Sequence, residues 1–445
     1  MNCREEYSKK LRTADEAVRS VKDGDWVDYC QTCSFPTALD KALAKRKGEL
    51  RDVRIRNAIT MAPVATVESD PGRESFTYNL WHCSGLDRKY IDSGRAFFSP
   101  MLFRNIGAYY SRGLAPVDVA MITVAPMDEH GDFSFGLTNC DMAEMLGAAK
   151  KIILEANPNM PVIYGTENDR INIRDADLVV ESDEPVSTVK GPSASETDRK
   201  IAENIFPYLH DGITLQLGIG GIPNALGTLI SQSDIKDIGM HTELMSDGYL
   251  DLYKAGKITN ARKALNTGKG IFSICNGSRE LYDFLDRNPD ILSAPMAYVN
   301  DPSVIGQLDD FISINGCLKA DLYGQVSSES AGTRQISGTG GQLDFVTGAF
   351  LSRGGNAFLT MHSTFTDRQG KLCSNIVPKF TEGDIITVPR SQSPCIVTEY
   401  GAAFMPGKTV WERAEALINI AHPDFRDELV KAADAQHIWR RSNRI

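Results

Sequence analysis

Short apolar runs alternate with amphipathic stretches along the first part of the chain. The apolar runs are rich in Val and Ile, as expected for strands, and the stretches between them have the period of helices. We predict strands at Trp26–Tyr29, Val53–Ile55, Val117–Val124 and Ile152–Leu154, and helices at Pro36–Ala44 and Asp141–Ala149. This alternation is typical of βαβ units, so the fold class is predicted to be α/β with open parallel sheets.

The same pattern continues in the second part of the chain. A helix is predicted around Ala202–His210. Further strands are predicted at Thr214–Leu217, Ile271–Cys275, Phe311–Ile314, Phe358–Met361, Ile385–Val388 and Ile396–Thr398. From Thr409 the period is helical, and Pro423 is expected to begin a new helix.

The two parts repeat one another. Around Gly24 the chain reads KDGDWVDY, then FPTALDKAL, then LRDVRIRNA; around Gly212 it reads HDGITLQL, then GIPNALGTL, then IKDIGMHTE. Each copy has an acidic turn with Gly, a strand, a turn with Pro, a helix and a second strand. The repeat is much longer than the 20–50 residues of a solenoid unit, so it predicts two similar open-sheet lobes from an internal duplication.

A further similarity joins VDVAMITVAPMDEHGDFSFG, from Val117, with NAFLTMHSTFTDRQGKLCSN, from Asn356. Both segments contain an apolar strand, a polar turn that ends in Gly131 or Gly370, and a short strand. We therefore expect these two segments to be counterparts in the two lobes.

One carboxylate occurs in only one copy. Counted from Asp52 and Asp237, the counterpart of Glu243 in the first copy is Ala58. A glutamate here could act as a base, a metal ligand or a covalent nucleophile, or could be an ordinary solvated side chain. Ligands of open α/β sheets gather at the carboxyl ends of strands, which favours a functional role for Glu243.

A polar segment separates the two copies. ESDEPVSTVKGPSASETDRK, from Glu181, contains two prolines and several serines and little apolar material. We predict an N-terminal α/β lobe at residues 1–185, a linker at 186–200 and a C-terminal α/β lobe at 201–445.

Composition narrows the class of protein. The 445 residues are 42% hydrophobic and 24% charged, as in a soluble globular protein, and the net charge is −10. No run of Lys or Arg is long enough to follow a nucleic-acid backbone. No apolar run approaches a membrane span of about 20 residues, and the charged start does not resemble a signal peptide. We expect a cytoplasmic protein whose nine cysteines are reduced.

The cysteines and histidines give no pattern of metal ligands. Cys30 and Cys33 form a CxxC, which can serve redox chemistry or metal binding, but no second CxxC or spaced His pair accompanies it. An ordinary turn is favoured for this pair, and His82, His241 and His362 are interpreted as structural. No metal site is predicted.

Two glycine-rich segments are candidate ligand loops. LGIGGIP, from Leu217, leads from a strand into a helix, and its backbone N–H groups could bind phosphate or an oxyanion. The segment does not complete the dinucleotide fingerprint G-x-G-x-x-G or G-x-G-x-x-A. SGTGGQLDF, from Ser337, is either mobile or shaped around a ligand. A tight turn and a flexible hairpin are the structural alternatives.

Together these segments resemble the family I coenzyme A-transferases, in the acetyl-CoA hydrolase/transferase group. The resemblance is carried by LQLGIGGIP, HTELMSDGYLDLYKAG, YVNDPS, INGCLKADLYGQV, GTGGQLDFVTGAF, IVTEYG and ALINIAHPDF. The N-terminal segments ADEAV, KDGDWVDY, ALDKALAK and SGRAFFSP are most like butyryl-CoA:acetate CoA-transferases, whereas CQTCSFP departs from that pattern.

The resemblance implies the roles of individual residues. Glu243 matches the family's nucleophilic glutamate. The matches to CoA-binding positions are Gly218, Ile219, Gly220, Gly221, Ile222, Asn300, Leu318, Gly341, Arg368 and Glu399. Coenzyme A is a substrate in this chemistry, and no cofactor is implied.

The resemblance also implies the activity: CoA moves from a short-chain acyl-CoA, butyryl-CoA, to a carboxylate, acetate, by ping-pong chemistry through a glutamyl-CoA thioester. It implies a homodimer or larger homo-oligomer that acts in butyrate and fatty acid metabolism. A 4-hydroxybutyrate or propionate CoA-transferase and an acyl-CoA hydrolase on the same scaffold remain alternatives. A dinucleotide-dependent oxidoreductase rests only on GIGGIP, and a non-enzymatic ligand sensor has no supporting motif.

Overall fold

The computed structural model describes residues 2–445, which divide into two compact units. The first unit comprises the chain up to Lys190 together with residues 271–299 and 335–340, and the second comprises residues 191–270, 300–334 and 341–445. The break after Lys190 falls inside the predicted linker, and the two later segments of the first unit lie outside the predicted N-terminal lobe. The boundaries 1–185 and 201–445 stay a prediction.

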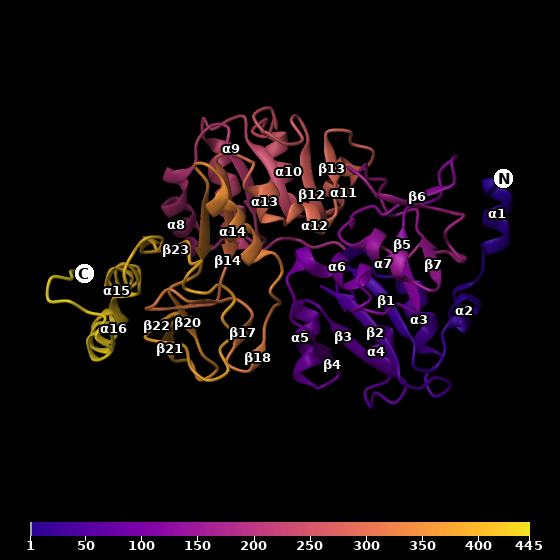
Figure 1. The fold of residues 1–445 in the computed structure, drawn as a ribbon, viewed down its shortest axis with the longest axis horizontal. Helices are drawn as coiled ribbons and strands as arrows, with labels where there is room; N and C mark the ends of the chain where they lie inside the picture. The colour runs from indigo at the N-terminus through magenta and orange to yellow at the C-terminus, as the bar shows by residue number, and fades with distance from the viewer. Residues whose placement is uncertain (1) are drawn as a thin grey trace. The chain divides into compact units, whose positions relative to one another are not determined.

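A seven-stranded sheet forms the centre of the first unit, with strand order β4-β3-β2-β1-β5-β7-β9 (Figure 1). Its neighbouring strands all run parallel. The strands are β1 (Trp26–Gln31), β2 (Val53–Ala58), β3 (Phe76–Leu80), β4 (Ala96–Phe98), β5 (Val119–Val124), β7 (Ile152–Ala156) and β9 (Leu178–Glu181). Every residue of β5 and of β7 is buried, as expected for central strands of a parallel sheet that is covered on both faces.

Helices and short strands complete the first unit. The helices are α1 (Cys3–Lys10), α2 (Ala14–Ala17), α3 (Thr37–Ala44), α4 (Ala65–Ser69), α5 (Gly85–Asp92), α6 (Ile106–Ser111), α7 (Met142–Ala148), α11 (Arg279–Leu285) and α12 (Met296–Val299). The remaining strands are β6 (Asp132–Ser134), β8 (Arg170–Asn172), β12 (Gly270–Cys275) and β13 (Ile291–Ser293). β6 and β8 form an antiparallel pair.

The second unit contains consecutive sheet strands in the order β11-β10-β14-β19-β23-β24. The strands are β10 (Thr214–Leu217), β11 (Gly239–Met245), β14 (Phe311–Gly316), β19 (Asn356–Thr360), β23 (Cys395–Thr398) and β24 (Gly401–Phe404). All pair in parallel except β23 with β24. The carboxyl ends of five neighbouring strands therefore meet at one edge.

The helices of the second unit are α8 (Glu196–Ile205), α9 (Gly221–Gln232), α10 (Asp247–Lys254), α13 (Pro302–Ile305), α14 (Gln342–Leu351), α15 (Val410–Asn419) and α16 (Pro423–Ala435). Its short strands are β15 (Lys319–Asp321), β16 (Val326–Ser327), β17 (Ser330–Ala331), β20 (Thr364–Thr366), β21 (Leu372–Ser374) and β22 (Ile376–Val377), and β18 (Arg334–Gln335) lies at the boundary of the units. Among the described residues, no helix is both long enough and apolar enough to span a membrane.

Backbone register confirms that the two lobes are similar. Trp26 pairs with Arg54 in the first sheet, and Thr214 pairs with Gly239 in the second. The turns before these strands also match. Gly24 and Gly212 have φ of 79° and 80°, and Asp52 and Asp237 have φ of 54° and 59°. The predicted α/β fold with two similar open-sheet lobes is therefore correct, and the same register makes Ala58 the counterpart of Glu243.

Two sequence-based expectations are wrong. β5 lies beside β1, whereas the strand beside β10 is β14, so the counterpart of β5 is β14 and not β19. The similarity between the segments at Val117 and Asn356 reflects their common strand-and-turn pattern rather than equivalent places. The predicted strand Ile385–Val388 is not formed; only Val388 makes an isolated bridge, to Val326, and Ile385 is 46% exposed.

Candidate active site

The carboxyl edge of the second sheet collects most of the predicted site residues. Glu243 lies near the end of β11, Gly218 directly follows β10, and Leu318 and Glu399 follow β14 and β23. β10 and β11 pair in parallel, with Thr214 opposite Gly239. Continued by four residues, this register places Gly218 opposite Glu243. Open α/β sheets bind their ligands at this edge, where the strand order reverses.

Two groups hold the Glu243 carboxylate. Asn300 is fully buried, and its Nδ2 donates to Oε2 of Glu243 at 2.5 Å. The backbone N–H of Gly341 donates a second hydrogen bond to the same carboxylate. These residues come from three distant parts of the chain, so the fold alone brings them together.

Gly341 must be a glycine for this contact to form. A Cβ atom at this position would overlap both Oε2 of Glu243 and Nδ2 of Asn300. The absence of a side chain lets the backbone N–H reach the carboxylate directly. The SGTGG segment thus contributes a specific donor at its end, and α14 begins at the next residue, Gln342.

Burial governs the acidity of Glu243. It raises the pKa of this carboxyl to about 7, although the hydrogen bonds from Asn300 and Gly341 favour the charged form and oppose the rise. Near neutral pH the side chain is therefore divided between carboxylate and carboxylic acid. A carboxylate that is only partly solvated is a better nucleophile than one in bulk water.

Asn300 has an unused acceptor. Its Oδ1 is buried and accepts no hydrogen bond from the described residues. Buried polar atoms are normally paired, so an unpaired amide oxygen beside a reactive carboxylate is suited to a donor on a ligand.

The β10–α9 turn offers backbone donors. Gly220 is the N-cap of α9 with φ of 126°, a conformation that only glycine adopts easily, and no side chain caps the helix. Ile219 is 66% exposed, so the turn is accessible. The N–H groups of Gly220, Gly221 and Ile222 lie at the N-terminus of α9. This helix has twelve residues, and its dipole favours negative charge at this end.

The remaining predicted residues have other partners or lie apart. Glu399 accepts hydrogen bonds from the N–H of Ser363 at 3.0 Å and from its Oγ at 2.6 Å. It therefore holds the segment after β19. Leu318 is partly exposed, and its N–H donates to the carbonyl of Ser327. Arg368 is exposed in the loop of the β20–β21 hairpin and makes no ion pair with any described residue.

Two amides from segments that carry the family resemblance stabilise loops near the site. Gln342 donates from Nε2 to the carbonyl of Gly316 at 2.6 Å and accepts from Oγ of Ser328 at 2.6 Å. Gln325 donates to Asp321 at 2.6 Å and closes its own turn. Both side chains stabilise loops at the carboxyl edge.

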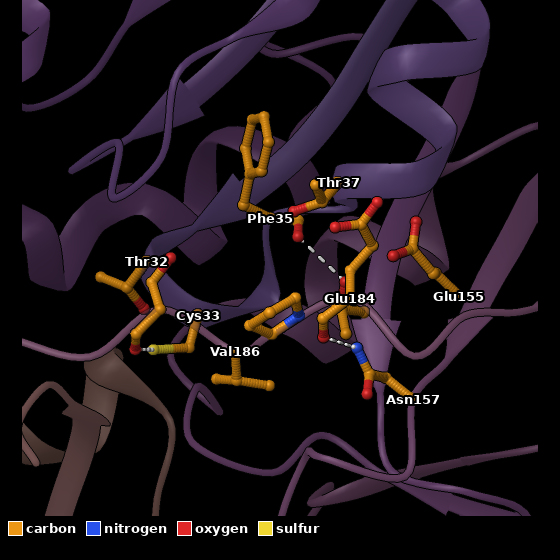
Figure 2. Close-up of a pocket in the computed structure, with 11 residues that line it drawn as sticks. Thr32, Cys33, Phe35, Thr37, Glu155, Asn157, Glu184 and Val186 are labelled. Carbon is orange, nitrogen blue, oxygen red and sulfur yellow. Dashed lines mark hydrogen bonds between the residues drawn. The ribbon is translucent and has the colours of Figure 1, made fainter. Parts of the chain in front are cut away.

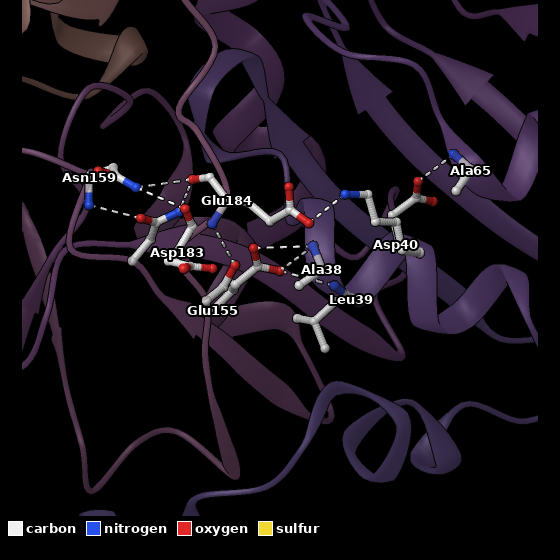
Figure 3. A network of polar contacts seen from close by, with 11 residues as sticks. Ala38, Leu39, Asp40, Ala65, Glu155, Asn159, Asp183 and Glu184 are labelled. Atoms are coloured by element: carbon white, nitrogen blue, oxygen red, sulfur yellow. Dashed lines mark hydrogen bonds and ion pairs between the residues drawn. The ribbon is translucent and has the colours of Figure 1, made fainter.

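In the first unit, segments of the chain itself occupy the place that corresponds to the candidate site, at the carboxyl ends of the central strands. A small pocket lies at the carboxyl ends of β1, β5 and β7 (Figure 2). Fully buried Glu155 of β7 accepts the N–H groups of Ala38 and Leu39, each at 3.0 Å, at the start of α3 (Figure 3). Asn157 donates to the carbonyl of Glu184, which fixes the segment that lines the pocket. The α3 N-terminus therefore binds an internal carboxylate, whereas that of α9 has no side-chain cap.

The cysteines of the CxxC do not face one another. Sγ of Cys30 lies 3.8 Å from Sγ of Cys140, whereas Sγ of Cys33 contacts Oδ1 of Asn276 at 3.4 Å and the hydroxyl of Tyr282 at 3.5 Å. All nine cysteines are free thiols, as predicted. Of the histidines, His362 pairs with Asp198 at 2.8 Å, and burial lowers the pKa of His82 to about 4.

Known proteins share this architecture and sequence. The N-terminal domain of acetyl-CoA hydrolase/transferase matches residues 1–190, and the C-terminal domain of the same family matches residues 277–433. The chain belongs to the acetyl-CoA hydrolase/transferase family.

Two relatives are similar to this chain over nearly their whole length. The chain is 48% identical to a butyryl-CoA:acetate CoA-transferase of Anaerostipes caccae, with 100% of both chains covered. It is 46% identical to a probable butyrate:acetyl-CoA coenzyme A-transferase of Syntrophomonas wolfei, with 99% and 98% covered. The structure of RipA from Yersinia pestis superposes with a TM-score of 0.90 at 34% identity and covers 98% of this chain and 100% of RipA.

Proposed function

We propose that the protein transfers CoA from butyryl-CoA to acetate, with Glu243 as the covalent nucleophile. The observation that carries this proposal is the Glu243 carboxylate, held by Asn300 and by the N–H of Gly341 at the carboxyl edge beside the β10–α9 turn. The family membership supports CoA-transferase chemistry, and the full-length similarity to butyryl-CoA:acetate CoA-transferases supports this substrate pair.

The chemistry proceeds through two covalent species. The Glu243 carboxylate attacks the thioester carbonyl, and the C–S bond breaks to give a mixed anhydride and CoA thiolate. The thiolate then attacks the carbonyl of the Glu243 side chain and releases butyrate, which leaves a glutamyl-CoA thioester. Acetate reverses these steps and leaves as acetyl-CoA, with Glu243 regenerated.

The surrounding groups fit these steps. Each attack generates an oxyanion, for which the uncapped N–H groups of the β10–α9 turn are suitable donors. The remaining CoA contacts are proposed at Leu318, Arg368 and Glu399, with Glu399 acting through Ser363. The unpaired Oδ1 of Asn300 can accept an N–H of the pantetheine arm.

Hydrolysis is the alternative on the same scaffold. Water in place of acetate would convert either covalent species into a free acid, and the family includes hydrolases by its own description. A 4-hydroxybutyrate or propionate CoA-transferase differs only in the acid pair. The cytoplasmic location, the homo-oligomeric state and the role in butyrate metabolism belong to the same proposal.

Covalent labelling tests the assignment of the nucleophile, and steady-state kinetics tests that of the acceptor. The protein is incubated with butyryl-CoA, reduced with borohydride and digested, and the modified peptide is sequenced. We expect a label on Glu243, and none in Glu243→Gln.

Initial rates with acetate should give parallel double-reciprocal lines, and release of free CoA should be slow without acetate. Intersecting lines, a label on another residue, or fast acetate-independent CoA release would each contradict the proposal.

A further inference from the structure

A buried cluster of sulfur and oxygen atoms lies in the first unit, outside the site described above. Sγ of Cys30, Sγ of Cys140 and a carboxylate oxygen of Asp141 all lie within 4.8 Å of one another. Cys30 and Cys140 are 5% and 1% exposed, and Asp141 is 2% exposed. None of these side chains takes part in the proposed transfer chemistry.

The spacing of the two sulfurs suits a tetrahedral metal ion. Two thiolates bound at 2.3 Å to a tetrahedral zinc ion lie about 3.8 Å apart. The observed Sγ–Sγ distance is 3.8 Å. Both cysteines have left-handed backbone conformations, with φ of 56° at Cys30 and 34° at Cys140. Such backbone conformations are unfavourable for residues other than glycine, so the fold maintains them at a cost in free energy.

The oxygen donors lie at the same place. Asp141 accepts the Sγ–H of Cys140 at 2.5 Å. If the carboxylate oxygen moved about 1 Å away from this sulfur, both atoms could bind the same ion. Gln31 is 2% exposed, and its Nε2 lies 2.8 Å from Sγ of Cys140 and 3.0 Å from Oδ1 of Asp141. Its Oε1 is buried and accepts no hydrogen bond from the described residues. A flip of the side-chain amide, which exchanges the positions of Nε2 and Oε1, would present Oε1 as a fourth ligand.

We propose that Cys30, Cys140, Asp141 and Gln31 form a structural zinc site. Binding would release the two thiol protons and leave two thiolates and one carboxylate on the ion, a donor set that zinc accepts. The ion would fix the end of β1 to the start of α7. No step of the proposed transfer reaction depends on it, so the site and the transferase function can fail independently.

The site can be tested on the full-length protein. The chain is expressed in medium supplemented with zinc or with cobalt, purified with a non-chelating reductant and dialysed against a weak chelator. We expect about one ion per chain, because a buried site is loaded during folding. The cobalt form should show thiolate-to-metal charge-transfer absorption. Cys140→Ser should lose the ion and the absorption, whereas Cys33→Ser, a change at another buried cysteine of the same segment, should keep both.

A measurement on the unmodified chain covers the case in which Cys140→Ser does not fold. Zinc X-ray absorption should show two sulfur neighbours at 2.3 Å and light-atom neighbours at about 2.0 Å. Zinc with only oxygen and nitrogen neighbours, no bound ion, or equal metal content in a folded Cys30→Ser/Cys140→Ser variant would overturn the proposal.

Discussion

Asn300 donates a hydrogen bond to Glu243 at 2.5 Å across 57 residues of sequence. The donor favours the carboxylate, whereas burial of the same group favours the neutral acid, and burial has the larger effect on the pKa. The reactive form of Glu243 is thus maintained by a balance of opposing influences. Loss of the Asn300 hydrogen bond should raise the pKa of Glu243, and exposure of Glu243 to water should lower it.

The first prediction concerns the pH dependence of the reaction. The nucleophile is the carboxylate, so kcat/KM for acyl-CoA should rise with pH and level off above the pKa of about 7. Asn300→Ala removes a hydrogen bond to the charged form, so its midpoint should lie at higher pH, and its plateau should fall at least about tenfold. Asn419→Ala, which loses an amide contact to the carbonyl of Arg444 instead, should keep the original midpoint. An unchanged midpoint in Asn300→Ala would contradict the role given to this amide.

The second prediction concerns stability. The pKa of Glu243 is raised from 4.5 when unfolded to about 7 when folded. Below pH 4.5 the group is protonated in both states. Between pH 4.5 and about 7 the folded chain keeps a proton that the unfolded chain has released, so stability falls across this range and levels off above it. Glu243→Gln resembles the protonated form and should gain about 3 kcal/mol over the original chain at pH 8 but almost nothing at pH 4. Urea unfolding at both pH values measures this difference, and an equal effect at both would argue against a raised pKa.

The third prediction concerns Gly341. An added methyl group would overlap Oε2 of Glu243 and Nδ2 of Asn300, so Gly341→Ala should displace the nucleophile and lower kcat by at least about a hundredfold. Gly316→Ala is the matched control, because a Cβ atom there meets no other atom within 4 Å. The displaced carboxylate should also lose its protection from water, so the ratio of hydrolysis to transfer should rise. Equal activity of the two variants would mean that the Gly341 segment is only a connector.

The sequence predicted the central strands because they are buried and rich in β-branched residues. It missed β3, whose sequence FTYNL alternates buried and partly exposed positions, and it missed the short strands β4 and β9, which have three and four residues. It placed a strand at residues 385–388 because two isoleucines lie there, although both are more than 40% exposed. Local hydrophobicity does not distinguish a buried run from an exposed one.

The sequence pointed to some residues of the candidate site but not to the contacts between them. Glu243 stood out because its counterpart in the duplicated copy is Ala58. The contact of Asn300 with Glu243 joins distant segments and follows no spacing rule, so only the fold shows it. The contact of Glu399 with Ser363 spans 36 residues, and no pattern in the sequence predicts it. The resemblance named the candidate residues, and the structure shows which described groups they contact.

The fourth prediction separates a positioning role of Glu399 from a direct contact with the substrate. If Glu399 acts by holding Ser363, Glu399→Gln and Ser363→Ala should each raise KM for acyl-CoA, and the double variant should be little worse than either one. The coupling should be about 1.5–3 kcal/mol, because the hydrogen bonds involve a charged group. Independent effects of the two changes would instead indicate that Glu399 contacts the substrate directly. Steady-state kinetics of the four proteins with butyryl-CoA gives the coupling.

The last prediction concerns the duplicated lobe. Ala58 is the register counterpart of Glu243, so Ala58→Glu places a carboxylate at the equivalent point of the first sheet. We expect no transferase activity from this carboxylate in a Glu243→Ala background, because a carboxylate alone does not make the site. The first unit uses the N-terminus of α3 to bind Glu155, so those N–H groups are not free to stabilise an oxyanion.

The measurement is butyryl-CoA:acetate transfer by Glu243→Ala and by Glu243→Ala/Ala58→Glu, with borohydride labelling of both. Circular dichroism and thermal unfolding first establish that the double variant is folded, since Ala58 is 2% exposed and a buried glutamate there is destabilising. Activity of the folded double variant should equal that of Glu243→Ala, without a label on residue 58. Recovered transfer with a label at that position would show that the first lobe has kept a working site, and that the internal carboxylate of Glu155 does not prevent catalysis there.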